Sequence, residues 1–426
     1  MKISPRSYRY LVPALLPLAA LYLLWRARKQ PSYLKNWGER FAWSDFPRPR
    51  EARPVIWIHA VSVGETNATR PLVQAILKRW PQCDILLTHM TPTGREAGQR
   101  IVQLAPDHIR QCFLPYDAVY AVRKFLRQTQ PILGLLMETE VWPTVLEEAH
   151  SLGIPMVLVN GRLSEKSFKQ AMRVPELMKK AMSRFVAVCA QADNDAKRFL
   201  KLGTVEPVLT GSLKFDIQAP KAALTKAAEW KKVLLHPVVL FASTRDGEEA
   251  LIVEALKKSI RPDVTYLLVP RHPQRFEEVE SLLKDSAITY QKRSELKNPA
   301  DIKSSTRVIL GDSMGEMFFY CALADVTLMG GSFKHFGCQN VIEPASVGVP
   351  VIVGPSTFNF SMVVEKGMQM GAITQVDNVE SAIDLAHEWL ESAQRLQELK
   401  QKALTFSQTY VGATARTMKV LEGIVK

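Results

Sequence analysis

The 426-residue sequence lacks several features that mark common enzyme and metal-binding classes. It has only five cysteines, none in a CxxC pair and none in a cluster with histidines at metal-ligand spacing: Cys83, Cys112, Cys189, Cys321 and Cys338. The HExxH, Walker A and GxGxxG patterns are also absent. We therefore predict a protein of a reducing compartment, with no structural zinc and outside the enzyme classes that those patterns mark.

Acidic residues are in deficit, and the formal net charge is +13. A basic balance of this size favours anionic partners, namely nucleic acid, anionic lipid or phosphorylated substrates, and charge alone does not choose among them. The composition, 47% hydrophobic, is that of a globular protein. A chain of this length exceeds one ordinary hydrophobic core, so we expect two or three domains.

Long uncharged apolar runs are missing except near the N-terminus. LVPALLPLAALYLLW, from Leu11 to Trp25, has no charged residue, and basic residues follow it at once. The run is shorter than the ~20 apolar residues of a comfortable span, but it is flanked by aromatic residues and has no small-residue cleavage site after it. We predict that residues 1–30 form an uncleaved membrane anchor that leaves the rest of the chain in the cytoplasm; a buried core helix and a signal peptide are the alternatives.

From Pro54 onward, short apolar runs alternate with helical patterns. The first half contains VIWIHAV, DILLTHM, HIRQCFLPY, PILGLLMET, PMVLVNG, RFVAVCA and PVLTGSL. A lysine-rich helical stretch interrupts the alternation near residues 216–232, and it resumes with PVVLFAST, TYLLVPR, RVILGDS, DVTLMGG and PVIVGP. This pattern is typical of parallel sheets covered by helices on both faces, so we predict two doubly wound α/β domains.

In such sheets, ligands bind beyond the carboxyl ends of the strands, so the residues after each run are the informative ones. In the second half, Arg271 of PRHP is placed to pair with a phosphate. GDSMGEM opens a helix whose backbone N–H groups could hold an anion, although an ordinary turn capped by Asp312 or Ser313 is equally compatible. Asn340 and Glu343 have the spacing of a capping box, but an acidic residue there could also bind a ribose diol.

In the first half, the strand ends carry single charges. Glu65 in HAVSVGE lies at a helix start, a position that stabilises a carboxylate and would lower its pKa, and it is also where a general base could stand. Glu138 follows an apolar run and must be either paired, with an arginine as the obvious partner, or functional. Glu140, Lys214 and Asp216 lie at neighbouring ends. Asp193 and Asp195 match a DxD pattern, which we interpret as helix capping in preference to metal binding.

Taken in order, HAVSVGE, TPTG, LPYD, ETEVWP, NGRLS, GSLKFD, PRHPQRF, GDSMGEM, GGSF, NVIEP and GPSTFNF resemble the motifs of the Kdo transferases. Those enzymes transfer 3-deoxy-D-manno-octulosonic acid (Kdo) from CMP-Kdo onto a lipid A precursor. The resemblance extends from about residue 30 to about residue 365 and includes an N-terminal anchor. This chain departs from the family in GCQN, where Cys338 and Gln339 replace a glycine and a histidine, and in STRDGEE, where STHEGEE is common.

The resemblance implies a GT-B glycosyltransferase with an N-terminal anchor helix and two Rossmann-like domains. Residues 31–218 would bind the acceptor and residues 219–426 the donor. By similarity, Glu65 matches the proton acceptor, and Glu138 and Lys214 match residues assigned to transition-state stabilisation. The CMP site would comprise Pro270, Arg271, Met314, Gly315, Glu316, Asn340, Val341, Ile342 and Glu343.

The implied reaction is an inverting displacement with Glu65 as general base and no metal, in which CMP-Kdo is a co-substrate and no cofactor is needed. The implied partners are CMP-Kdo, a lipid A precursor and an anionic membrane surface at the cytoplasmic face of the inner membrane. A membrane-associated glycosyltransferase using another nucleotide sugar and a non-catalytic nucleotide-binding membrane protein are the alternatives. A nucleic-acid partner is not favoured, because the strand ends lack interleaved aromatic and basic residues.

Overall fold

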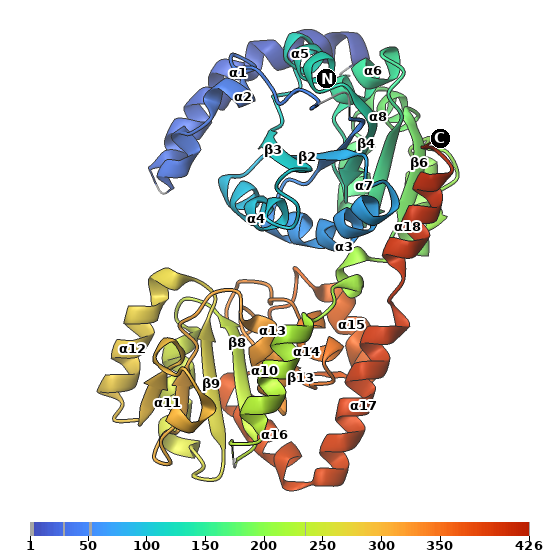
Figure 1. The fold of residues 1–426 in the computed structure, drawn as a ribbon. Helices are drawn as coiled ribbons and strands as arrows, with labels where there is room; N and C mark the ends of the chain where they lie inside the picture. The colour runs from blue at the N-terminus through green and yellow to red at the C-terminus, as the bar shows by residue number, and fades with distance from the viewer. Residues whose placement is uncertain (1–3, 29, 51–52, 235, 426) are drawn as a thin grey trace. The chain divides into compact units, whose positions relative to one another are not determined.

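Two parallel sheets organise the protein (Figure 1). The computed structural model describes residues 4–28, 30–50, 53–234 and 236–425. The chain divides into two compact units, one formed by Met1–Ile217 with Val411–Lys426 and the other by Gln218–Tyr410. This architecture confirms the predicted α/β fold class.

The first unit contains a seven-stranded sheet in the order β3-β2-β1-β4-β5-β6-β7, and every pairing is parallel. Its strands are β1 (Val55–His59), β2 (Asp84–His89), β3 (Ile109–Phe113), β4 (Pro131–Met137), β5 (Met156–Gly161), β6 (Phe185–Ala190) and β7 (Val208–Leu209). The order reverses direction between β1 and β4, which is the position where doubly wound sheets bind ligands. Six of these strands match the predicted apolar runs closely, and β7 is reduced to two residues.

Helices cover both faces of this sheet, because its strands are apolar on both sides. Along β1, Val55 and Trp57 pack in one core cluster and Ile56 and Ile58 in another. The helices of the unit are α1 (Pro5–Ala27), α2 (Trp37–Arg40), α3 (Val63–Arg79), α4 (Pro92–Val102), α5 (Val119–Thr129), α6 (Pro143–Ser151), α7 (Glu165–Ala171), α8 (Pro175–Met182), α9 (Asp193–Lys201) and α18 (Ala413–Glu422).

The C-terminal helix α18 differs from the sequence prediction, which assigned residues 219–426 to one domain. Residues 411–426 belong to the first unit, where Ala413, Met418 and Leu421 complete the core on the α3 face. The carboxylate of Asp216 accepts hydrogen bonds from the backbone N–H of Gly412, at 2.6 Å, and of Thr414. Asp216 therefore caps α18, and the predicted boundary at residue 218 lies one residue from the observed change of unit.

The second unit also has a seven-stranded parallel sheet, in the order β10-β11-β9-β8-β12-β13-β14. Its strands are β8 (Val238–Thr244), β9 (Thr265–Pro270), β10 (Tyr290–Lys292), β11 (Val308–Leu310), β12 (Val326–Met329), β13 (Val351–Val353) and β14 (Ile373–Gln375). The two edge strands β10 and β14 were not predicted. Each has only three residues and few apolar side chains, so neither produces an apolar run.

The helices of the second unit begin with α10, at the lysine-rich stretch where the sequence predicted a helical connection. Those on one face form a core with β8, β9 and β12 that includes Ile252, Val279 and Ile383. The set is α10 (Lys221–Lys231), α11 (Glu248–Ser259), α12 (Phe276–Asp285), α13 (Met317–Leu323), α14 (Ile342–Ser346), α15 (Ser361–Gln369), α16 (Val379–Glu391) and α17 (Ala393–Thr409).

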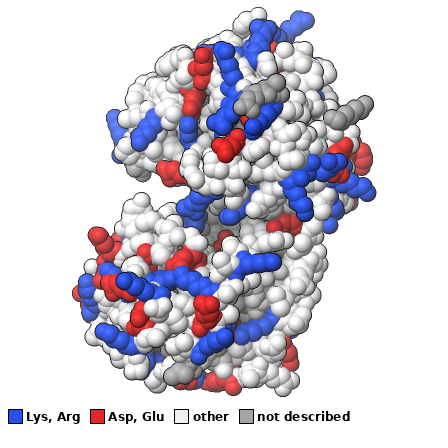
Figure 2. Space-filling view, in the orientation of Figure 1, with Lys and Arg blue, Asp and Glu red and all other residues white. Residues whose placement is uncertain are grey.

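The net charge of +13 is dispersed on the face shown in Figure 2. Lysine and arginine side chains cover parts of both units in this view, and acidic side chains lie among them.

Candidate active site

Three glutamates lie at the carboxyl ends of β1 and β4, the neighbouring strands where the order of the first sheet reverses. Glu65 stands in the first turn of α3, directly after β1, and Glu138 and Glu140 follow β4. Burial, and then the negative charge of Glu138, raises the pKa of Glu65. Burial, and then the negative charge of Glu65, raises the pKa of Glu140, so the three carboxyl groups form one electrostatic cluster. We call Glu65, Glu138, Glu140 and their partner Lys214 the carboxylate cluster.

Glu65 is held by the start of its own helix. The N-cap residue Ser62 accepts a 3.4 Å hydrogen bond from the Glu65 backbone N–H, and its hydroxyl donates to Glu65 Oε1 at 3.1 Å. Glu65 Oε2 accepts from the Val61 backbone N–H at 2.7 Å. This reciprocal arrangement resembles a capping box, and it fixes the carboxyl group in one orientation.

The protonation of Glu65 differs from the sequence expectation of a lowered pKa. Burial, followed by the charge of Glu138, raises its pKa, and the hydrogen bonds from Val61 and Ser62 only partly oppose this. Capping and a raised pKa thus coexist, because the helix start stabilises the anion while desolvation and a like charge destabilise it. A fixed carboxylate with increased proton affinity is suited to accept a proton.

Glu138 is paired with Lys214, whereas an arginine was the expected partner. The Lys214 Nζ lies 2.9 Å from Glu138 Oε1, and Asn160 Nδ2 donates to the same oxygen at 3.4 Å. Asn160 also accepts a 3.0 Å hydrogen bond from the Leu213 N–H through Oδ1 and so ties the Lys214 turn to β5. Glu138 and Asn160 both have φ of 55°, a left-handed conformation that non-glycine residues adopt at some energetic cost.

The buried His59 lies beside Glu140 of the carboxylate cluster. His59 is fully buried at the end of β1, and its Nε2 lies 3.9 Å from Glu140 Oε2. The Trp142 indole N–H donates to that carboxylate oxygen at 2.8 Å. Burial, followed by the charge of Glu65, raises the pKa of Glu140 to about 7.

Two buried histidines support this edge of the sheet in their neutral forms. Burial lowers the pKa of His59 to about 3 and that of His89 to about 4. His89 Nδ1 lies 3.0 Å from the carbonyl oxygen of Ala60, and His59 Nδ1 lies 2.8 Å from Thr88 Oγ1. They therefore add no positive charge near neutral pH, and Lys214 is the cation that this edge places against a carboxylate of the cluster.

The ends of β8 and β9 in the second unit carry the opposite charge. Arg271 directly follows Pro270 at the end of β9, and its backbone N–H donates to the Thr244 carbonyl at 3.0 Å. Burial lowers the pKa of His272, and the nearby positive charges of Arg245, Arg271 and Arg275 lower it further. We call these three arginines the arginine cluster; it is suited to bind an anion.

The acidic residues beside the arginine cluster are buried and bind partners within the second unit. Glu248 is fully buried and accepts from the N–H groups of Arg245 (2.8 Å), Gly331 (2.7 Å) and Phe333 (2.9 Å), so it fixes the GGSF turn. Glu249 is also fully buried and pairs with Arg275 at 3.1 Å. Arg275 also pairs with Asp246 and Glu278, so it is committed to ion pairs.

The GDSMGE turn follows β11 and leads into α13. Gly315 has φ of 84°, and a Cβ there would meet no heavy atom within 4 Å, so its backbone faces open space. Glu316 is paired with Lys226 at 2.6 Å and Arg293 at 3.0 Å, and these cations lower its pKa although burial opposes them. The N-cap residue of α13 is Glu316, so neither alternative cap, Asp312 or Ser313, caps this helix. Asp312 instead accepts from the Ser294 backbone N–H.

The QNVIEP segment starts α14 without the capping box that its spacing suggested. The N-cap residue is Val341, and Asn340 Oδ1 accepts from the Ile342 N–H at 3.1 Å. Glu343 is therefore not needed as a cap. Burial raises its pKa, while hydrogen bonding to Asn340 and the charge of Arg271 oppose the rise. This electrostatic link associates Glu343 with the arginine cluster.

The DxD pattern lies at the start of α9, but the N-cap residue is Ala192. Asp193 forms an exposed ion pair with Lys197 at 2.5 Å, and Asp195 accepts from the Leu163 N–H at 2.9 Å. Within the described residues, no group of three or more His, Cys, Asp or Glu side chains is arranged to hold a metal ion.

Sequence reasoning named every residue of the carboxylate cluster and Arg271 of the arginine cluster, but it missed His59, Arg245 and Arg275. His59 was visible as the first residue of HAVSVGE, yet nothing in the sequence showed that Glu140 would lie beside it. Arg245 is one of the residues at which STRDGEE departs from the family motif.

Comparison with known proteins relates the chain to one family. A family model described as 3-deoxy-D-manno-octulosonic-acid transferase (kdotransferase) matches residues 35–217. The chain is 39% identical over 421 residues to the 3-deoxy-D-manno-octulosonic acid transferase of Bordetella pertussis, covering 96% of this chain and 97% of the relative. The corresponding transferase of Haemophilus influenzae is 32% identical over 395 residues, covering 89% of this chain and 90% of the relative.

A solved structure extends the comparison of the fold. UDP-GlcNAc 2-epimerase from Neisseria meningitidis bound to UDP-GlcNAc is 14% identical and has a TM-score of 0.56, covering 87% of this chain and all of the epimerase chain. At this level of identity the likeness concerns the GT-B-like fold alone.

Proposed function

The chain belongs to the Kdo transferase family of glycosyltransferases, and from this premise we propose that it transfers Kdo from CMP-Kdo to a lipid A precursor. The observation that carries the proposal beyond family membership is the carboxylate cluster. There the carboxyl group of Glu65 is fixed in orientation, its pKa is raised, and the Glu138–Lys214 pair is its neighbour.

In the proposed step, Glu65 removes the proton from a sugar hydroxyl of the acceptor while that oxygen attacks the anomeric carbon of Kdo. The new carbon–oxygen bond forms as the bond from that carbon to the phosphate oxygen of CMP breaks. CMP leaves with the bonding electrons from the opposite face, so the anomeric configuration inverts. The fixed orientation of Glu65 and its increased proton affinity support this role.

Protonation of Glu140 supports the role of Glu65 as the general base. With its pKa raised to about 7, Glu140 retains its proton to a higher pH than an ordinary carboxyl group, which limits the negative charge beside Glu65. Lys214 supplies positive charge against Glu138 and is available to offset charge that develops as the donor reacts.

The second unit is proposed to bind CMP. Arg271 would pair with the phosphate, and the turn of Met314, Gly315 and Glu316, whose backbone is open at Gly315, would approach the nucleotide. Residues Asn340–Glu343 complete the site, and the Glu343 carboxylate, which does not cap α14, would bind a ribose diol. The step needs no metal, since lysine and arginine provide the positive charge.

The location of the enzyme follows from its acceptor. A lipid A precursor remains in the bilayer, and helix α1 is 23 residues long and apolar enough to cross a membrane. We therefore place the enzyme at the cytoplasmic face of the inner membrane.

The test is mass spectrometry of the products formed by the purified protein, CMP-Kdo and a tetraacylated lipid A precursor. The proposal predicts a product heavier by one or more Kdo residues, and the mass also counts how many are added. Product formed only with another nucleotide sugar would favour a different glycosyltransferase. CMP binding without any transfer would contradict the proposed reaction.

A further inference from the structure

Helix α1 is apolar around its whole circumference, yet the protein covers only one stripe of it. Val12 and Leu16 pack against the core formed with α5 and α6, while Leu16, Ala20, Leu23 and Ala27 pack around Tyr33 and Phe41. These positions recur every three or four residues and therefore form one line along the helix. The stripe runs almost the full length of α1, so the helix lies on the first unit from end to end.

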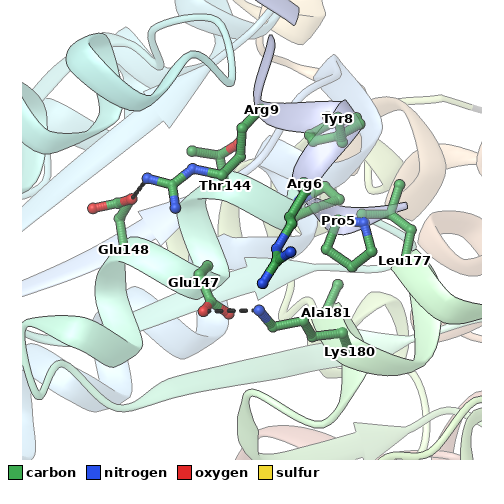
Figure 3. Close-up of a pocket in the computed structure, with 11 residues that line it drawn as sticks. Pro5, Arg6, Tyr8, Arg9, Thr144, Glu147, Glu148, Leu177, Lys180 and Ala181 are labelled. Atoms are coloured by element: carbon green, nitrogen blue, oxygen red, sulfur yellow. Dashed lines mark hydrogen bonds and ion pairs between the residues drawn. The ribbon is translucent and has the colours of Figure 1, made fainter. Parts of the chain in front are cut away.

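The N-terminal end of α1 is fixed by polar contacts to the first unit (Figure 3). The Tyr8 hydroxyl donates to Asp117 Oδ2 at 2.9 Å, and Asp117 is a buried residue that also accepts from the N–H groups of Thr144 and Val145. Arg9 pairs with Glu148 of α6 at 3.4 Å. Figure 3 shows this end of the helix above α6 and α8, with Arg6 projecting toward Glu147. These contacts hold the N-terminal end at the body of the unit.

The C-terminal end is held by the segment that follows it. Residues 31–46 turn back along α1, and the Arg26 guanidinium donates to the Tyr33 hydroxyl at 3.0 Å. Arg40 anchors this segment to the sheet, because it is buried, donates to the Met90 carbonyl at 3.0 Å and stacks 3.7 Å from the centre of the Phe113 ring. Both ends of α1 are thus attached to the same sheet unit.

The opposite face of α1 carries large apolar side chains in solvent. Tyr10 is 80% exposed, Leu18 59% and Leu21 60%, and four further residues of α1 are 44–55% exposed: Leu15, Tyr22, Leu24 and Trp25. No acidic residue lies in α1, while Arg6, Arg9, Arg26 and Arg28 lie within or beside its two ends. Aromatic and basic residues around an apolar face are the composition that anionic bilayer surfaces bind.

We propose that α1 lies in the plane of an anionic membrane surface, with its covered stripe on the first unit and its exposed face in the lipid, and does not cross the bilayer. A helix of 23 residues spans ~34 Å, enough to reach the far side only if one end leaves the body. If α1 crossed the bilayer, either Tyr8 would lose its hydrogen bond to the buried Asp117 or Leu23 would leave the apolar cluster around Tyr33 and Phe41. The inference rests on the membrane location in the proposed function but not on the reaction.

Topology can be tested by cysteine labelling, because the five native cysteines are buried. Single cysteines are introduced at exposed positions near the two ends of α1, as Ser7→Cys in its first turn and Lys35→Cys after its last turn, and in the second unit as Gln274→Cys. We expect a membrane-impermeant maleimide to modify none of them in spheroplasts and all of them in inverted membrane vesicles. Any result in which Ser7→Cys differs from Lys35→Cys overturns the proposal.

The lipid contact is tested separately by flotation with vesicles of phosphatidylglycerol and phosphatidylethanolamine. Replacing Leu18 and Leu21 by Gln should lower the fraction bound by about tenfold or more, because two apolar side chains no longer enter the lipid. The matched control replaces Leu209 and Leu251, which are 49% and 41% exposed elsewhere, and should float like the parent. Equal flotation of the Leu18/Leu21 variant and the control overturns the lipid contact.

The docking of α1 is checked by two tyrosines on the same helix. Tyr8→Phe removes a donor from buried Asp117 and should lower the Tm in detergent by a few degrees, whereas Tyr10→Phe, at an exposed position, should not. Equal Tm values for the two variants overturn the docking. None of these readouts involves Kdo transfer, so an inactive protein that passes them refutes the proposed function alone.

Discussion

Each unit has a seven-stranded parallel sheet, but the strand orders differ and the ends of the strands carry opposite charge. The first unit gathers Glu65, Glu138 and Glu140 where its strand order reverses, with Lys214 as their cation. The second unit gathers arginines at the ends of β8 and β9. Its own acidic residues there, Glu248 and Glu249, are buried and bind partners within the unit.

This contrast shows that the function of each unit lies in its loops and not in its sheet. A group of partly buried carboxyl groups favours proton uptake, because burial and like charges raise proton affinity. A group of arginines beside an open glycine turn favours binding of a phosphate. The proposed division of labour, with the base in the first unit and CMP in the second, follows from this difference.

The largest expected effect separates the base from the nucleotide site. Glu65→Gln should lower turnover by about 1,000-fold, because general base catalysis typically contributes this order of magnitude. CMP binding, measured by calorimetry, should change less than about twofold, since Glu65 belongs to the first unit. Glu176→Gln, at an exposed glutamate of α8, is the matched control and should retain full turnover. A Glu65→Gln enzyme with more than a tenth of the parent rate would refute the assignment.

The second largest effect is on the affinity for CMP. Arg271→Ala should weaken CMP binding by about 10- to 100-fold, because a charge-assisted hydrogen bond contributes ~1.5–3 kcal/mol. The control Lys303→Ala removes an exposed cation of the same unit and should leave the Kd for CMP unchanged. Calorimetric titration of CMP checks both variants, and equal affinities in the two would remove Arg271 from the site.

A smaller effect concerns stability and pH. The folded-state pKa of Glu140, about 7, is above the ordinary 4.5, so the folded state binds the proton more tightly and this contribution to stability is lost as pH rises from 4.5 through 7. Glu140→Gln, which mimics the protonated form, should therefore be more stable than the parent by about 3 kcal/mol at pH 8 and by only about 1 kcal/mol at pH 5. Urea unfolding at both pH values measures this; the same difference at pH 5 and pH 8 would contradict a raised pKa.

The smallest effect concerns the DxD pattern. Asp193 forms an exposed ion pair with Lys197 on the surface of α9, so Asp193→Asn should change the free energy of unfolding by less than about 0.5 kcal/mol. We also expect neither this substitution nor an excess of EDTA to alter turnover. A loss of activity restored by a divalent cation would revive a metal-dependent mechanism.

The fold and the positions of the site residues could largely be predicted, because both depend on local patterns. Apolar runs mark buried parallel strands, and the residues after them must lie at the carboxyl edge of a sheet. This placed Glu65, Glu138 and Arg271 correctly at strand ends. The three-residue strands β10 and β14 escaped because their pairing depends on neighbours in the sheet and not on their own apolarity.

The features that the sequence did not predict depend on contacts between residues that are distant in the chain. The return of α18 to the first unit depends on Asp216 meeting Gly412. The pKa of Glu65 was predicted in the wrong direction, because the helix start was visible in the sequence and the approach of Glu138 was not. The capping box that the spacing of Asn340 and Glu343 suggested does not form, because α14 begins at Ile342 and its N-cap residue is Val341.

The pH dependence of turnover in the parent and in Glu65→Gln tests the central claim most directly. A general base must be ionised, so the account predicts that the parent rate rises with pH through an apparent pKa above 4.5, and that the residual rate of Glu65→Gln lacks this rise. A Glu65→Gln enzyme that keeps the same acid limb would show that another group accepts the proton.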